Sequence, residues 1–134
     1  MRSVEDLLPV RSSVRLRIYA WSPKNPAPEY QGLIKVGQTT REDVRERIRE
    51  SQGQVQQEFT LHADVVAERE DGSIFRDKDV IERLKAKGFE NPHFGSASEW
   101  VRCKPIDVLT AITELRRGEV FSGHHYQTFP MRPE

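Results

Sequence analysis

Three polar side chains, each on a different predicted element, have the chemistry to act together on a phosphate group. Tyr19 lies in an alternating stretch, Lys35 in a second apolar stretch, and Arg47 on a helix that is predicted to follow. A guanidinium is planar and always charged, which suits phosphate, and a phenol or an amine beside it can transfer a proton if its pKa is lowered. These residues therefore form a candidate site for phosphate chemistry.

The same residue types also have ordinary structural roles. A tyrosine in a strand usually packs against its neighbours, and a helix rich in arginine and glutamate is usually a solvated face. Arg41, Arg45 and Arg49 recur every four residues and extend a basic ridge, although glutamates alternate with them. The residues alone leave both interpretations open.

Other kinds of site receive little support from the sequence. No glycine-rich loop of the nucleotide-binding kind occurs. Trp21 is able to stack on a base, although packing on the proline-rich loop after it is more typical. The four histidines, His62, His93, His124 and His125, do not form a zinc pattern with the single cysteine, Cys103. We expect Cys103 to be a buried or half-buried thiol.

Alternating hydrophobicity predicts the strands that position the candidate residues. Residues 14–21 alternate with a period of two, with Ile18 and Ala20 on one face, which predicts a strand with one buried face. Residues 32–38 predict a second strand, and the loop of three prolines between them predicts a long-looped antiparallel hairpin. Residues 59–65 predict a third strand, and residues 99–102 a short extended piece.

Capping and spacing signals predict about three helices. A capping box at residues 39–42 predicts a helix that ends near Gly53. A second helix is predicted over residues 78–87, with Gly88 as its stop. A third begins at Pro105 and ends before Gly118, with an inward stripe formed by Ile106, Leu109, Ile112 and Leu115.

Length and composition predict one small domain. The chain has 134 residues, with 21 Lys plus Arg and 21 Asp plus Glu, so its net charge is zero, which excludes a strongly basic histone-like protein but not a local basic face. A single cysteine permits no intrachain disulfide, and no signal peptide or membrane-spanning stretch is present. We expect a cytoplasmic α+β domain with a small, mostly antiparallel three-stranded sheet flanked by about three helices.

Short segments in a fixed order resemble a known family. The segments are Ile18-Tyr19-Ala20, then Gly32-Leu33-Ile34-Lys35-Val36-Gly37-Gln38-Thr39, then Asp43-Val44-Arg45-Glu46-Arg47-Ile48. Together they resemble the core of the GIY-YIG nuclease superfamily, and most of all its phage-type subfamily, in which the second motif reads Lys-Ile-Gly. Residues 71–80 and 99–101 resemble the second half of that subfamily, so the likeness runs over residues 14–112.

The resemblance implies a role for each candidate residue. It implies that Tyr19 helps to activate water and that Arg47 stabilises the phosphate. In such a mechanism we expect Lys35, together with Tyr19, to manage protons. The resemblance further implies a divalent metal, Mg²⁺ or Mn²⁺, held near the start of the later helix, where the nearest carboxylate is Asp77. The remaining residues that we expect to bind substrate are Arg17, Gly37, Arg41 and Arg45.

The sequence departs from the family pattern at several of these positions. Arg17 replaces the glycine of the first motif, and Lys35 stands where many members have tyrosine. Asp77 is one methylene shorter than the family's metal-binding glutamate, and Asp79 and Glu82 are neighbouring substitutes. We therefore expect either a metal-dependent DNA endonuclease or a catalytically degenerate DNA-docking module. A protein-interaction domain is a third hypothesis.

The C-terminal residues predict a larger enzyme. The segment Phe129-Pro130-Met131-Arg132-Pro133-Glu134 resembles the opening of the adenine-reading motif of superfamily-two helicases. On this reading residues 1–13 are a lead-in, residues 14–118 the nuclease-like domain, and residues 119–134 a linker toward a helicase domain of a restriction-type enzyme. A tail with a chance Arg-Pro-Glu is the equal alternative.

Overall fold

Four strands form one antiparallel sheet in the computed structural model of the protein, which describes residues 14–93 and 98–120. The strands are β1 (Arg17–Pro23), β2 (Leu33–Thr39), β3 (Phe59–Val66) and β4 (Trp100–Arg102), in the spatial order β3-β1-β2-β4. The predicted α+β class is confirmed. The predicted count of three strands was one too low, because residues 100–102 pair with β2 at the edge of the sheet.

The β1–β2 pair is the predicted long-looped hairpin. A short 3-10 helix, η1 (Pro28–Tyr30), lies in its loop. Tyr19 lies opposite Gly37, and Trp21 lies opposite Lys35. Residues directly opposite one another in an antiparallel pair point to the same face, so Tyr19 and Lys35 share a face.

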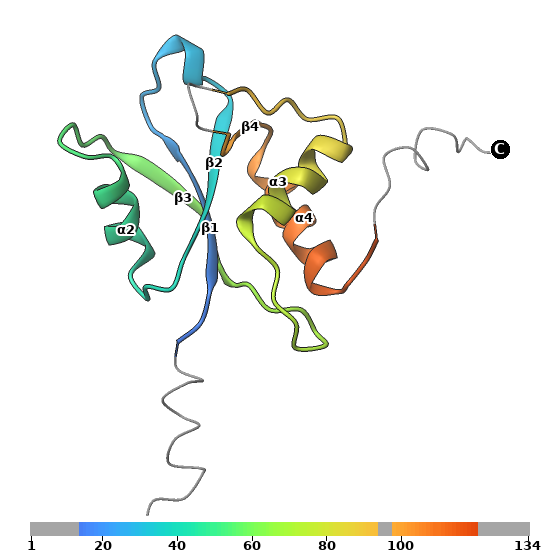
Figure 1. Ribbon diagram of the computed structural model, residues 1–134. Helices are drawn as coiled ribbons and strands as arrows, with labels where there is room; N and C mark the ends of the chain where they lie inside the picture. The colour runs from blue at the N-terminus through green and yellow to red at the C-terminus, as the bar shows by residue number, and fades with distance from the viewer. Residues whose placement is uncertain (1–13, 94–97, 121–134) are drawn as a thin grey trace, which may run out of the picture.

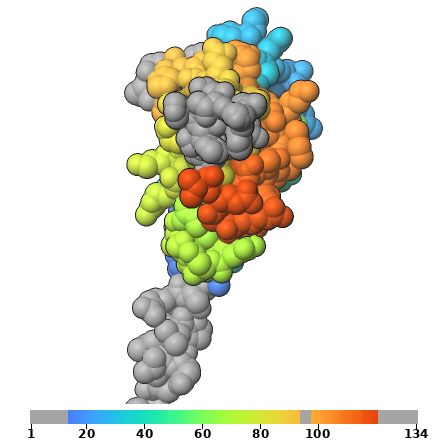
Figure 2. All heavy atoms as spheres, turned by 90° about the vertical axis from the view of Figure 1, so that its right-hand side faces the viewer, coloured from blue at the N-terminus to red at the C-terminus, as the bar shows by residue number. Residues whose placement is uncertain are grey.

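Three helices cover the two faces of the sheet. They are α2 (Val44–Ser51), α3 (Asp77–Ala86) and α4 (Pro105–Arg116). In Figure 1 the sheet stands between α2 on one side and α3 with α4 on the other. Seen from the second side, α3 and α4 form the outer layer of the molecule (Figure 2).

The alternation predicted that β1 has one buried face. Both of its faces are buried, because helices lie on both sides of the sheet. Ile18 and Ala20 have no exposed surface, and Tyr19 and Trp21 are only 4% and 2% exposed. A period of two separates the faces of a strand but does not say which face meets solvent. A central strand between two helical layers is buried on each side.

The two faces hold different kinds of core. The cluster under α3 and α4 is almost wholly aliphatic, with Phe75 as its largest fully buried side chain; its other members include Val36, Leu84, Val101 and Val108. The cluster under α2 is mainly aromatic and consists of Tyr19, Trp21, Leu33, Val44, Ile48, Phe59 and Trp100.

Two details of the helices differ from the sequence prediction. The helix α2 begins later than the predicted capping box, because Asp43 is the cap and accepts a hydrogen bond from the Glu46 amide at 3.0 Å. On α4, Ile106 is 62% exposed and Leu109 38% exposed. Its buried stripe is formed instead by Val108, Ala111, Ile112 and Leu115.

None of the helices in residues 14–93 and 98–120 combines the length and the apolar composition that are needed to cross a bilayer.

Candidate functional site

The ring of Tyr19 lies across the backbone of β2 at Gly37. A Cβ atom placed on Gly37 would come within 2.6 Å of both the Cζ and the hydroxyl oxygen of Tyr19. Such a distance is a steric clash, so any side chain at this position would force the tyrosine to move. The glycine of the second motif therefore provides the space that lets the phenol of β1 reach across its neighbouring strand.

The charges of groups from three further segments act on the Tyr19 hydroxyl. Burial raises the pKa of Tyr19 above its ordinary value, the Arg47 guanidinium opposes that rise, and the carboxylates of Glu99 and Asp77 raise the pKa further. Coulombic effects of this kind need short distances. The α2 residue Arg47, the first residue of α3 and the residue preceding β4 thus each lie near enough to β1 for their charge to act on its phenol.

A hydrogen bond ties the start of α3 to β2 next to Gly37. The backbone N–H of Asp77 donates to Oε1 of Gln38 at 3.0 Å. The predicted neighbour Asp79 is occupied as a cap, because its Oδ2 accepts from the Arg76 amide at 2.8 Å. Glu82 lies 3.5 Å from the Lys85 ammonium. Of the three acidic side chains considered at this helix, Asp77 is the one that acts on Tyr19.

Asp77 and Glu99 form a pair of mutually repelling carboxylates. Burial raises the pKa of Asp77, hydrogen bonds from backbone amides oppose that rise, and the nearby charge of Glu99 adds to it. A divalent cation relieves this kind of repulsion, and Mg²⁺ is commonly held by one or two carboxylates with water and phosphate as its other ligands. The donor set therefore fits Mg²⁺ or Mn²⁺, although no three His, Cys, Asp or Glu side chains in the described part of the chain gather into a metal cage.

Lys35 connects the site to an aromatic neighbour. Its Nζ lies 3.7 Å from a carboxylate oxygen of Glu99 and 5.8 Å from the centre of the Trp100 ring. Glu99 was not among the predicted site residues. The extended piece that carries it was visible in the sequence, but its pairing with β2, which aims Glu99 at Lys35, was not.

The three other arginines that were predicted to bind substrate contact other parts of the fold. Arg17 forms an ion pair with Asp64 of β3 at 2.9 Å, and Arg41 forms one with Glu50 of α2 at 2.6 Å. Arg45 lies 5.8 Å from the centre of the Phe59 ring. None of these three is among the groups whose charge affects Tyr19, whereas Arg47 and Asp77 are. Lys35 is linked to this set through Glu99.

A basic surface lies beside Phe59, at the end of β1 away from Arg17. Arg45 and Arg49 both pack over the Phe59 ring, and with Lys24 and one acidic residue, Glu58, they line a hollow of about 400 Å³. The ion pairs found in the described residues all involve other basic side chains. Cations that lack a carboxylate partner are available to phosphate.

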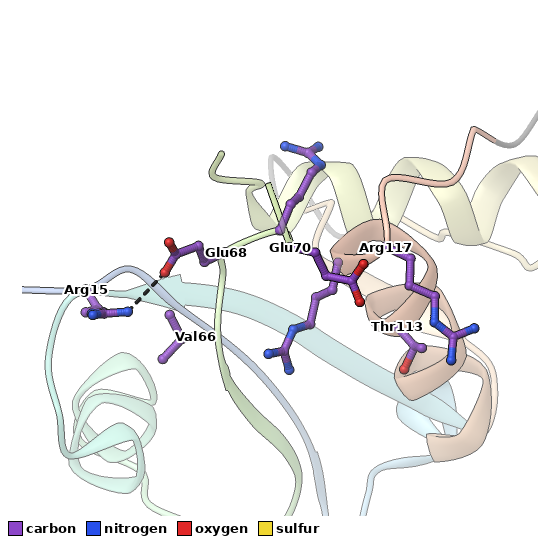
Figure 3. A pocket seen from close by; sticks show the side chains of 8 residues that line it. Arg15, Val66, Glu68, Glu70, Thr113 and Arg117 are labelled. Atoms are coloured by element: carbon purple, nitrogen blue, oxygen red, sulfur yellow. Dashed lines mark hydrogen bonds and ion pairs between the residues drawn. The ribbon is translucent and has the colours of Figure 1, made fainter. Parts of the chain in front are cut away.

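A wider hollow, of about 570 Å³, lies elsewhere and is not the candidate site. Arg15, Glu68, Glu70, Thr113 and Arg117 are among the residues that line it (Figure 3). Arg15 forms an ion pair with Glu68 at 3.0 Å, and Arg117 lies 3.7 Å from Glu119. Its charges are partly neutralised within the fold, and it contains none of the predicted site residues.

The single cysteine takes no part in the chemistry. Cys103 is half-buried, as predicted. Burial raises the pKa of its thiol to about 12, so the sulfur is protonated at neutral pH and is a poor nucleophile.

Comparison with known proteins gives one family. A family model described as the T5orf172 domain matches residues 17–116. This range begins at the first residue of β1 and ends at the last residue of α4, so it contains all the strands and helices named above. No curated protein and no solved structure matches the chain.

Proposed function

The chain belongs to the T5orf172 domain family, and on that premise we propose that it is a metal-dependent endonuclease domain of GIY-YIG type that hydrolyses DNA phosphodiester bonds. One observation carries the proposal. The charges of Arg47, Asp77 and Glu99, from three other segments of the chain, act on the Tyr19 phenol, which lies across a strand at a glycine. A phenol, a guanidinium and a carboxylate pair are the groups that phosphoryl chemistry uses.

Each group has a distinct role in this proposal. Arg47 is half-buried and has no carboxylate ion-pair partner among the described residues, so its donors are available for the scissile phosphate. Burial raises the pKa of Tyr19, whereas proton transfer by the phenol would need a lowered one, so in this proposal the neutral phenol positions water or donates to a phosphate oxygen. In this proposal Lys35, whose Nζ lies 3.7 Å from Glu99, manages a proton.

Asp77 and Glu99 are the residues that would hold the metal. A bound divalent cation would neutralise developing charge on the phosphate. The fold supplies the carboxylates at the first turn of α3 and beside β4, and the Gln38 hydrogen bond keeps Asp77 at this edge of the sheet. The position of Glu99 offsets the loss of one methylene at Asp77, because a second carboxylate is present.

The basic surface of Lys24, Arg45 and Arg49 extends the proposed DNA contact beyond the reacting phosphate. Binding through such cations releases counterions and weakens steeply as salt rises. We further propose that the domain works in the cytoplasm as part of a restriction-type enzyme with a helicase domain. That part rests on residues 129–134, which lie outside the described residues, as do the predicted lead-in and most of the predicted linker.

A second candidate function is a DNA-docking module that no longer cuts. Its support is that no three metal-binding side chains gather in residues 14–93 and 98–120, while the unpaired cations beside Phe59 remain. In that case salt-sensitive DNA binding would be found without cleavage.

The proposal is tested by a nicking assay on plasmid DNA with Mg²⁺ or Mn²⁺. Arg47→Ala removes the donor beside Tyr19, and we expect a rate lower by about 10²–10³-fold, as for loss of a transition-state donor. Arg117→Ala is the matched control, since Arg117 lies in the separate wider hollow, 3.7 Å from Glu119, and its rate should change little.

The outcomes separate the candidate functions. Nicking that depends on metal and on Arg47 supports the endonuclease. Salt-sensitive binding without nicking by the wild-type chain contradicts it and supports the docking module. Absence of DNA binding even at low salt would exclude both and leave a protein-interaction domain.

A further inference from the structure

Lys35 lies between a carboxylate and an aromatic ring at the margin of the candidate site. Its Nζ is 3.7 Å from Oε1 of Glu99 and 5.8 Å from the centre of the Trp100 ring. The Lys35 side chain is only 21% exposed, whereas that of Glu99 is 45% exposed. The ammonium is therefore the more enclosed partner, and the carboxylate keeps an open side from which a second cation can approach.

The backbone fixes this approach and leaves only the side chains to move. Lys35 is the register partner of Trp100 in the β2–β4 pair, and the Val36 amide donates to the Glu99 carbonyl at 2.9 Å. Main-chain hydrogen bonds thus hold both residues of the ion pair to the same two strands. The Lys35 ammonium can leave the Glu99 carboxylate without any change in the sheet, and the Trp100 ring can keep that ammonium nearby.

The Lys35 ammonium offsets one of the two carboxylate charges of the site. Among the described residues Glu99 forms an ion pair with Lys35, and Asp77 forms none. The charge of Glu99 nonetheless acts on Asp77. With one charge offset, the carboxylate pair attracts a divalent cation less than two bare carboxylates would. A metal ion that binds Glu99 therefore has to compete with Lys35.

We propose that Lys35 sets the metal affinity of the site by competing with the divalent cation for the Glu99 carboxylate. The inference rests on the proposed function, in which Asp77 and Glu99 hold the metal. In the metal-free protein the ammonium stabilises the Glu99 carboxylate, and metal binding releases the ammonium. The released ammonium is then available to an oxygen of the DNA phosphate. Lys35 thus lowers the metal affinity of the free domain and assists the reaction once metal and DNA are bound.

Mn²⁺ binding by the full chain without DNA tests the competition. Free Mn²⁺ is measured from its electron paramagnetic resonance signal at low ionic strength, so the readout does not depend on cleavage. Lys35→Met removes the ammonium but keeps an unbranched apolar stem beside Trp100. We expect this variant to bind Mn²⁺ about tenfold more tightly than the wild type, because a pair of exposed unit charges accounts for up to about fivefold and the metal carries twice the charge. The difference should shrink as KCl is added.

Further variants separate the Lys35 charge from other effects. Lys35→Arg keeps a cation beside Glu99, so its Mn²⁺ affinity should stay close to that of the wild type. Lys85→Met removes a lysine from a similar pair, in which the ammonium lies 3.5 Å from Glu82, and should also leave the affinity unchanged. Thermal unfolding shows which variants are folded, and Lys35→Gln is the second neutral variant if Lys35→Met is not.

The nicking rate distinguishes this role from a purely structural one. At saturating Mn²⁺ we expect Lys35→Met to nick plasmid DNA more slowly than the wild type, although it binds the metal more tightly. Loss of a structural contact would instead lower the metal affinity and the rate together.

Each other result overturns the inference. Equal or weaker Mn²⁺ binding by the neutral Lys35 variants would show that Lys35 does not compete with the metal, and would leave the proposed nuclease intact. An equal gain in Lys85→Met would assign the effect to net charge. An unchanged nicking rate in Lys35→Met would remove the released ammonium from the reaction. No Mn²⁺ binding by any variant would overturn the metal site, and with it the metal-dependent function on which the inference rests.

Discussion

The two faces of the sheet carry different classes of side chain. Toward α3 and α4 lie aliphatic side chains such as Ile18, Val36 and Leu84, with no exposed surface and no charge among them. Toward α2 lie Tyr19, Trp21 and Trp100, with Lys35 at their margin. The two sets of side chains lie on opposite faces of the same sheet.

The comparison shows where stability and chemistry reside. Aliphatic side chains in close packing contribute to the free energy of folding and have nothing to offer a ligand. Aromatic rings with hydroxyl, indole and ammonium groups also bury apolar area, but they keep polar atoms that can act on a substrate. Substitutions on the first face should therefore change stability, and substitutions on the second should change function.

Leu84→Ala is expected to have the largest effect, and only on stability. Leu84 of α3 has no exposed surface, and truncating such a residue destabilises the fold by about 2–5 kcal/mol. Denaturant unfolding measures the loss. At a temperature where the variant is folded, its DNA affinity should equal that of the wild type, and a selective loss of DNA binding would contradict the division between faces.

Gly37→Ala is expected to have an intermediate effect, on both properties. The added methyl group would come within 2.6 Å of the Tyr19 ring, and overpacking of this kind costs about 1–3 kcal/mol. Nicking should be lost as the phenol is displaced.

The clash explanation has its own control. In a Tyr19→Ala background the methyl group has no ring to meet, so Gly37→Ala should then cost much less stability. If the two costs simply add, the ring is not the obstacle.

Asp77→Asn is expected to have the smallest effect, and its sign depends on pH. The pKa of Asp77 is raised in the folded protein from an ordinary value of 3.8, so the folded state holds the proton more tightly than the unfolded state does. Wild-type stability therefore falls as pH rises through the interval above 3.8. Asparagine removes that fall, so the variant should gain in melting temperature relative to wild type as pH increases.

Asp71→Asn is the matched control of opposite sign. Hydrogen bonds from Ser73 lower the pKa of Asp71, so its contribution is present at neutral pH and is lost as pH falls below 3.8. Adding Mg²⁺ at pH 7 should raise the melting temperature of the wild type and of this control, but not of Asp77→Asn. An equal rise in all three would place the metal elsewhere.

The sequence predicts the local elements well because period-two alternation and capping residues are local signals. Strands 59–66 and 33–39 and helices 77–86 and 105–116 match their predictions to within a few residues. The burial of Tyr19 was not predictable from alternation, since it depends on α2 packing over that face. The position of Glu99 was equally hidden, because it is fixed by the pairing of Trp100 with Lys35 across the sheet.

The central place of β1 has a consequence for how the molecule can vary. Ile18 and Tyr19 are consecutive, so the peptide that joins them belongs at once to the hydrophobic interior and to the candidate site. A repacking under α3 that shifts this peptide sideways would move the phenol by a similar amount, with no substitution in the candidate site. Hydrogen exchange at the Tyr19 amide would register such a shift before a loss of cleavage is noticed.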